Sequence, residues 1–72
     1  MNDPLFCRGD IITHVKTGKG YVILREPNKF LRLEHCNEPF YVYRSYGEHT
    51  VQVLWYRCQS EMEDGRFVKT QR

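Results

Sequence analysis

The sequence contains no alanine, the residue with the highest helix propensity, whereas valine, isoleucine, threonine and aromatic residues are frequent. This composition disfavours a helical domain and favours strands. The chain also lacks any apolar run approaching the roughly 18 residues of a membrane span. Its hydrophobic share of 40%, with 14% aromatic residues, is too high for a disordered chain. We therefore expect a β-rich domain that folds in water and has no membrane partner.

An excess of either charge sign is missing as well. Eleven lysines and arginines face nine acidic residues, which leaves a formal net charge of +2. This balance by itself indicates neither a nucleic-acid nor a membrane partner. The length of 72 residues suffices for one domain, because two would each have too small a core. We expect a flexible lead-in over residues 1–8 and a single domain over residues 9–70.

The cysteines do not form any CxxC pair, and their number is odd. The N-terminus lacks the basic and long apolar parts of a signal peptide, so we expect a cytoplasmic protein with reduced thiols and at most one disulfide. Zinc ligation needs short, regular spacings of cysteine or histidine, which are absent. The residues considered as ligands are Cys7, His14, His35, Cys36, His49 and Cys58. We predict no metal site and no other cofactor.

Catalytic arrangements are also missing. Cys36 directly follows His35, and neighbours on a strand point to opposite faces, so this pair favours a nucleophile only if the segment is a turn. The acidic residues of segment 61–64 lie in a polar stretch beside a glycine, where solvation explains them. Gly18-Lys19-Gly20 lacks the helix start that a phosphate site needs. We expect no enzyme and no small-molecule substrate.

Alternating apolar residues and glycine turns predict two hairpins. The first joins residues 11–16 to 21–24, and the second joins 40–44 to 50–57. Residues 30–34 read as a short strand or a helical turn, of which we prefer the strand, and 66–70 reads as a last strand. The pattern favours an all-β fold, a small five-stranded antiparallel SH3-like barrel. An OB barrel is the alternative, but such domains are usually longer and carry a helix for which residues 34–38 offer little room.

Several short motifs resemble those of a bacterial family of short SH3-like domains of unknown function, over roughly residues 9 to 68. They are Gly9, His14-Val15-Lys16 with Gly18, Tyr21-Val22-Ile23-Leu24, Val42-Tyr43-Arg44, Trp55-Tyr56-Arg57 and Gly65-Arg66-Phe67. In that family the Trp-x-Arg group normally leads into a proline and a phenylalanine-containing segment, where Cys58-Gln59-Ser60 stands here. The resemblance implies an SH3-like fold without catalysis, and it transfers no site residues.

Within the second hairpin both faces are apolar. We expect Phe40 and Val42 to share the core face with Val51, Val53 and Trp55. The complete predicted core is Ile11, Val15, Val22, Leu24, Phe40, Val42, Val51, Val53, Trp55 and Phe67. The opposite face is then formed by Tyr41, Tyr43, Leu54 and Tyr56. In one interpretation these tyrosines line the barrel wall with their hydroxyls at the rim. In the other they form a binding surface.

We predict a non-enzymatic interaction module that binds a protein partner, or a second copy in a homodimer, through this aromatic face. Arg44 and Arg57 lie at the ends of the strands and would border it. Tyrosine and arginine supply much of the binding energy at interfaces. The second hypothesis is nucleic-acid binding, with tyrosines stacked on bases and the two arginines on phosphates. The small net charge counts against it.

Overall fold

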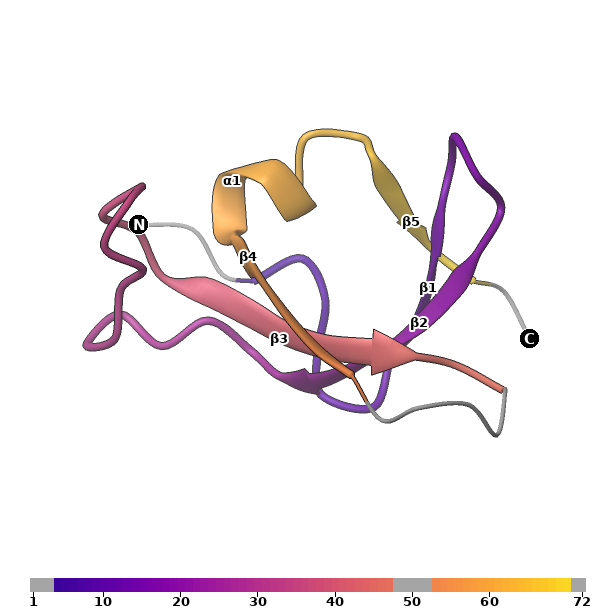
Figure 1. Cartoon of the computed structure of the whole chain (residues 1–72), viewed down its shortest axis with the longest axis horizontal. Helices are drawn as coiled ribbons and strands as arrows, with labels where there is room; N and C mark the ends of the chain where they lie inside the picture. The colour runs from indigo at the N-terminus through magenta and orange to yellow at the C-terminus, as the bar shows by residue number, and fades with distance from the viewer. Residues whose placement is uncertain (1–3, 48–52, 71–72) are drawn as a thin grey trace.

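Within the residues that the structure describes, the chain forms an antiparallel sheet of five strands and one helical turn (Figure 1). The computed structural model describes residues 4–47 and 53–70. Its elements are β1 (Ile11–His14), β2 (Gly20–Arg25), β3 (Phe40–Ser45), β4 (Leu54–Cys58), α1 (Gln59–Met62) and β5 (Phe67–Lys69). The strand order is β4-β3-β2-β1-β5. The predicted five-stranded antiparallel sheet is confirmed, but the sheet is not closed into a barrel, and β4 and β5 are its edges.

Both predicted hairpins form. In the first, β1 and β2 are joined by a tight turn in which the Gly18 N–H donates to the carbonyl of His14 over 2.7 Å. Gly18 has a φ of +77°, a conformation that glycine adopts without steric cost. In the second, β3 pairs with β4 over five residues of each strand. The predicted start of its returning strand, residues 50–52, lies outside the described residues.

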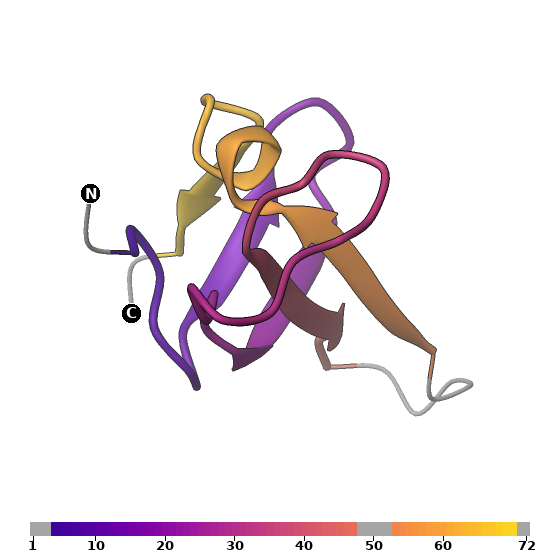
Figure 2. The same ribbon diagram turned by 90° about the vertical axis from the view of Figure 1, so that its left-hand side faces the viewer.

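Two segments differ from the prediction. Residues 30–34 do not form a strand, because residues 26–39 make a long loop whose one ladder contact is an isolated bridge between Leu33 and Glu38. The polar stretch after β4 contains α1, a turn of four residues that buries Met62. None of the helices in the described part of the chain is long and apolar enough to cross a membrane. The view in Figure 2 shows the 26–39 loop beside α1.

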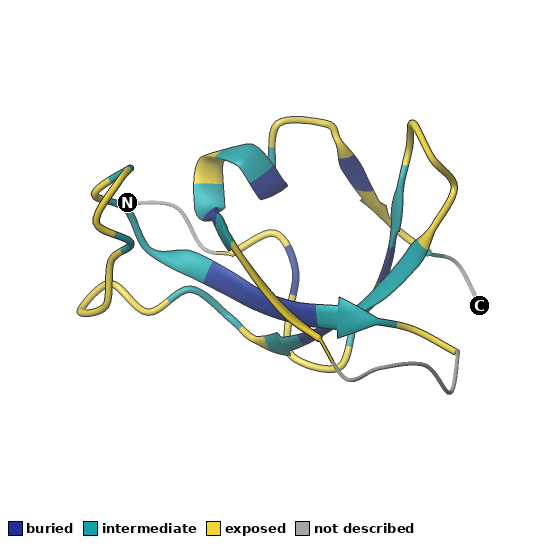
Figure 3. Cartoon of the chain, viewed as in Figure 1, coloured by how far each residue is buried: buried dark blue, intermediate teal, exposed yellow. Residues whose placement is uncertain are grey.

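One face of the sheet, here called the inner face, carries the hydrophobic core (Figure 3). α1 and the segment before β1 cover it with Met62 and Phe6. The strand residues in this core are Ile12, Ile23, Tyr41, Tyr43 and Phe67. Cross-strand pairs agree with a shared face, since Ile23 is opposite Tyr43 and Ile12 is opposite Tyr21. Residues directly opposite one another in a ladder project to the same side.

The predicted core is largely wrong, because alternate residues of β1 and β2 face the other way. Val42 and Phe67 are buried as expected. The half-buried members of the predicted set are Ile11, Val22, Leu24 and Phe40, and the exposed ones are Val15, Val53 and Trp55. Val51 lies outside the described residues. Both faces of β1 and β2 carry apolar residues, so the alternation in the sequence does not show which face is buried. An assignment that is wrong by one residue exchanges the two faces of a strand.

The segment expected to be a flexible lead-in is attached to the domain over residues 5–8. Phe6 is 2% exposed, and its ring centroid lies 5.8 Å from that of Tyr41. The backbone N–H of Leu5 donates to a carboxylate oxygen of Glu63 over 2.9 Å. The Arg8 N–H donates to a carboxylate oxygen of Glu26 over 3.1 Å. A buried aromatic side chain and these bonds make residues 5–8 part of the folded unit.

Candidate functional site

The ladder between β3 and β4 separates the four residues that were expected to form one aromatic face. Val42 is opposite Tyr56, and Arg44 is opposite Leu54. On the other side of the sheet, Tyr41 is opposite Arg57 and Tyr43 is opposite Trp55. Leu54 and Tyr56 therefore face outward, whereas Tyr41 and Tyr43 face the core. The predicted pairing was wrong by one residue.

Tyr41 is fully buried, so it cannot contact a partner. Its hydroxyl accepts a hydrogen bond from the Phe6 N–H at 3.1 Å and donates to a Glu63 carboxylate oxygen at 2.5 Å. Burial, and next the hydrogen bond to Glu63, raise the pKa of the Tyr41 phenol far above its ordinary value. This neutral hydroxyl connects the N-terminal segment to the residue that follows α1.

Tyr43 is also in the core, and it holds Arg57. The Arg57 Nε donates to the Tyr43 hydroxyl over 3.1 Å, and an Arg57 terminal nitrogen lies 3.5 Å from a carboxylate oxygen of Glu61. The guanidinium carbon is 5.8 Å from the ring centroid of Phe67. The Tyr43 bond is the main cause that raises the pKa of Arg57. Arg57 is therefore engaged within the domain and does not border an exposed tyrosine face.

An apolar patch remains on the outer face of β3 and β4. We call it the outer patch, and its members are Phe40, Val42, Leu54 and Tyr56. Leu54 is 49% exposed and Tyr56 is 56% exposed. The rings of Phe40 and Tyr56 pack with centroids 5.6 Å apart. Arg44 lies at one end of the patch, opposite Leu54, and donates to the Ser45 carbonyl at 3.1 Å.

The outer patch continues onto a free strand edge. β4 pairs with β3 on one side and has no second neighbouring strand among the residues that the structure describes. Proteins commonly protect such edges with lysine, proline or a covering segment. Leu54, Trp55 and Tyr56 are instead three consecutive large apolar residues, each between 44% and 56% exposed. This combination can accept an added strand from another chain.

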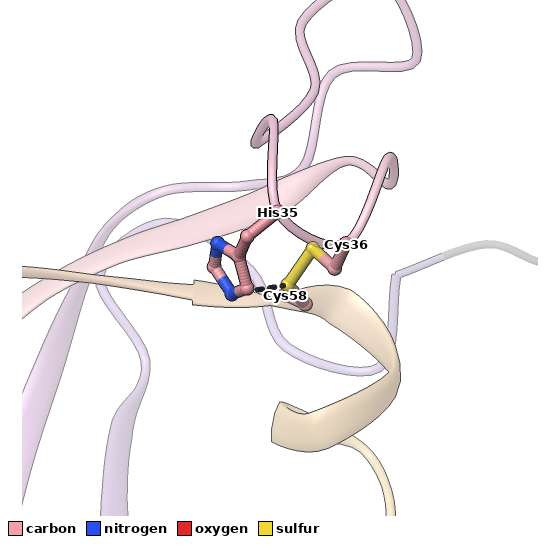
Figure 4. Close-up of side chains that lie close together, drawn as sticks. All are labelled: His35, Cys36 and Cys58. Carbon is pink, nitrogen blue, oxygen red and sulfur yellow. Dashed lines mark hydrogen bonds between the residues drawn. A yellow bond between two sulfur atoms is a disulfide. The ribbon is translucent and has the colours of Figure 1, made fainter.

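A second cluster lies where β4 meets α1. His35 and Cys36 belong to the turn 34–37, and both approach Cys58 (Figure 4). Cys36 and Cys58 are joined by a disulfide across 22 residues of sequence, and Cys7 is a free, exposed cysteine. The expectation of three reduced thiols is wrong for this structure. The segment with His35 and Cys36 is a turn rather than a strand, which is the exception under which neighbouring side chains need not point to opposite faces.

Comparison of the chain with protein-family models, curated proteins and solved structures finds no match.

Two residues of this candidate surface that are not buried were assigned to the core from the sequence. Phe40 is half-buried in the outer patch and Trp55 is 44% exposed on the edge strand, whereas Val42, which also lies in the patch, is buried as predicted. A signal for Trp55 was present, since it stands in a run of three large apolar residues followed by Arg57. A run of this kind has no polar face, which is unusual for a half-buried strand.

Proposed function

We propose that this chain is a non-enzymatic protein-binding module that accepts a partner strand at the free edge of β4. The observation that carries the proposal is the exposure of Leu54, Trp55 and Tyr56 on an edge strand. Backbone groups along the edge would bind the added strand, and the outer patch would bind its alternate apolar side chains. The partner is another protein or a second copy of this chain.

An SH3-like architecture and a cytoplasmic location form part of this proposal. The order β4-β3-β2-β1-β5, in which the last strand returns to pair with the first, supports an SH3-like arrangement. The helical turn α1 between β4 and β5 agrees with it. An open edge at β4 leaves a route for a partner that a closed barrel would not offer.

The charges near the surface favour a protein over a nucleic acid. Arg57 is paired with Glu61 and bonded to Tyr43, and Arg44 donates to a backbone carbonyl. Two tyrosines that would have stacked on bases, Tyr41 and Tyr43, are in the core. What remains exposed is mainly apolar, which suits a protein interface with weak salt dependence.

The variant Leu54→Lys tests the proposal, and Val68→Lys is its matched control. Leu54 and Val68 are both 49% exposed, both stand on edge strands and both face outward, but they lie at opposite edges of the sheet. A lysine on an edge strand discourages strand addition while leaving an exposed position soluble. The two variants therefore differ in which edge they block.

The assay combines affinity capture from a bacterial lysate, with and without nuclease, and sedimentation equilibrium of the purified chain. The proposal expects a protein retained by the wild type and by Val68→Lys but lost with Leu54→Lys, or a dimer with the same dependence. Retention that disappears with nuclease would favour the nucleic-acid hypothesis instead. Binding that neither variant changes, or no binding in either assay, would contradict the proposal.

A further inference from the structure

Three donor atoms with an affinity for soft and borderline metal ions converge beside the end of β4. The His35 ring nitrogen and the sulfurs of Cys36 and Cys58 all lie within 4.8 Å of one another. His35 Nε2 is 3.7 Å from Cys58 Sγ, and Figure 4 shows the imidazole turned toward the sulfurs. A tetrahedral zinc ion places a bound nitrogen and a bound sulfur about 3.6 Å apart, given its usual bond lengths. The imidazole is therefore already at ligand distance from Cys58.

The disulfide must first be reduced, because metal ions bind cysteine as the thiolate. A phosphine reductant cleaves the sulfur–sulfur bond, takes its oxygen from water, and leaves two thiols and a phosphine oxide. In a zinc site the two sulfurs would then stand about 3.8 Å apart. Cys58 is fixed at the junction of β4 and α1, whereas Cys36 belongs to the turn 34–37, so a small shift of the turn provides this separation.

The turn stays near Cys58 without the disulfide, because other bonds hold its base. The Glu38 carboxylate accepts hydrogen bonds from the Ser60 N–H at 2.9 Å and from the Ser60 hydroxyl at 2.8 Å. The Gln59 N–H donates to the Pro39 carbonyl at 2.9 Å, and Phe40 pairs with Cys58 in the ladder. Inside the turn, the Asn37 N–H donates to the Leu33 carbonyl at 2.7 Å. Reduction therefore frees the sulfurs and leaves the donor atoms assembled.

The donor set selects the kind of ion. Two thiolates and one imidazole suit zinc and similar ions, whereas magnesium and calcium prefer oxygen ligands. Three protein ligands leave the fourth tetrahedral position to water or to an external ligand. We propose that the reduced chain binds one zinc-class divalent cation through His35 Nε2, Cys36 Sγ and Cys58 Sγ. Binding releases the two thiol protons, and the disulfide and the metal exclude each other.

This site does not depend on the proposed protein-binding function, and the redox state controls it. In a glutathione-buffered compartment, protein thiols are mostly kept reduced. Under those conditions the metal-binding form of this cluster is the relevant one. Under oxidising conditions Cys36 and Cys58, which are 22 residues apart in the sequence, form the disulfide again and the ion is lost.

The test is a titration of the phosphine-reduced, metal-free chain with Zn²⁺ in competition with a chromophoric chelator. Co²⁺ is used as a second probe, because thiolate ligation gives it a charge-transfer absorption. The variants are Cys36→Ser, Cys58→Ser and His35→Gln, and Cys7→Ser is the matched control because Cys7 is a free, exposed cysteine. The far-UV spectrum of each variant reports whether it is folded.

The proposal expects one ion per reduced chain, none in the oxidised chain, and unchanged binding for Cys7→Ser. Cys36→Ser and Cys58→Ser should each lower the thiolate absorption, because each removes one of the two thiolate ligands. His35→Gln should weaken binding at least about tenfold, since the loss of even an outer-shell partner of a metal ligand usually costs that much. If Cys58→Ser does not fold, Cys36→Ser and His35→Gln still decide the question. No stoichiometric binding by the reduced chain, or binding that His35→Gln and Cys36→Ser leave unchanged, would overturn the proposal.

Discussion

Replacing Tyr41 with phenylalanine tests whether the N-terminal segment is tied to the core as the structure shows. The change keeps the buried ring and removes only the hydroxyl. The Phe6 N–H then loses the acceptor that lies 3.1 Å away, and Glu63 loses a donor at 2.5 Å. Glu63 keeps the Leu5 N–H and the Gln59 side-chain amide as donors. The variant therefore loses two interactions, which are the acceptor of the Phe6 N–H and one hydrogen bond to the Glu63 carboxylate.

A buried donor left without an acceptor costs about 1 to 3 kcal/mol, and a hydrogen bond to a charged group contributes a similar amount. We expect Tyr41→Phe to lower the free energy of unfolding by at least about 2 kcal/mol, the sum of the two lower limits. For a domain of this size each kcal/mol shifts the melting temperature by about 4 to 8 °C, so the expected fall is at least about 8 °C. Thermal unfolding followed by circular dichroism measures it.

Two other tyrosines provide matched controls for the same chemical change. Tyr43→Phe removes the acceptor of one bond from the half-buried Arg57 and should cost about 1 kcal/mol. Tyr56→Phe alters a side chain that is 56% exposed and should stay within about 0.5 kcal/mol of the wild type. If Tyr41→Phe melts together with Tyr56→Phe, the bonds from Tyr41 to Phe6 and Glu63 do not contribute to stability and the reasoning fails.

The same residue predicts a loss of stability in alkali. The folded state raises the pKa of Tyr41 above its unfolded value of about 10, first through burial and then through the bond to Glu63. A raised pKa of a phenol means that its contribution is complete below about pH 10 and is lost as the pH rises through the folded value. The Tyr41→Phe variant has no phenol at this position, so it should lose less stability than the wild type above about pH 10.

Three further predictions concern the core, the disulfide and the loop. Ile23→Ala should cost about 2 to 5 kcal/mol because Ile23 is buried, whereas Val53→Asp, at an exposed position, should leave the domain folded; chemical denaturation compares them. Reducing the bond between Cys36 and Cys58 in metal-free buffer should lower the free energy of unfolding by about 3 kcal/mol, given its 22-residue separation, and an unchanged unfolding curve would refute this. Hydrogen bonds from Ser60 lower the pKa of Glu38, so this carboxylate contributes stability that is lost as the pH falls below about 4.3. In Glu38→Gln the free energy of unfolding, measured as a function of pH, should therefore fall less in this acid range than in the wild type.

The two hairpins could be predicted from sequence because alternation and turn residues are local signals. The β3–β4 register could not, because both faces of this hairpin are apolar. When Tyr41 and Val42 are both suitable for a core, a slip of one residue leaves the hydrophobic pattern equally satisfied. In the observed register the hydroxyls of both buried tyrosines are hydrogen-bonded, since Tyr41 donates to Glu63 and Tyr43 accepts from Arg57. Of the two interpretations of the tyrosines, the one that places them in the wall of the fold describes Tyr41 and Tyr43 better than the one that places them on an exposed binding surface.

The cysteine cluster and the cover of the core depend on contacts distant in sequence. Cys36 and Cys58 are 22 residues apart, and nothing in their spacing marks them as a pair. Asn37, with a φ of +53°, is a local sign of the turn that carries Cys36, because asparagine tolerates this conformation better than most residues. Met62 is a single apolar residue in a polar segment, and Phe6 lies between Leu5 and Cys7 in a segment without strand periodicity. Their burial follows only once the sheet has formed.

The most direct test of the proposed binding edge is amide hydrogen exchange of the chain, free and in the complex that the capture assay retains. Strand addition at β4 should slow exchange at Leu54, Trp55 or Tyr56, where alternate amides point away from β3. The amides of β5, at the opposite edge, should exchange at the same rate in both states. Slower exchange at β5 with no change along β4 would contradict the account.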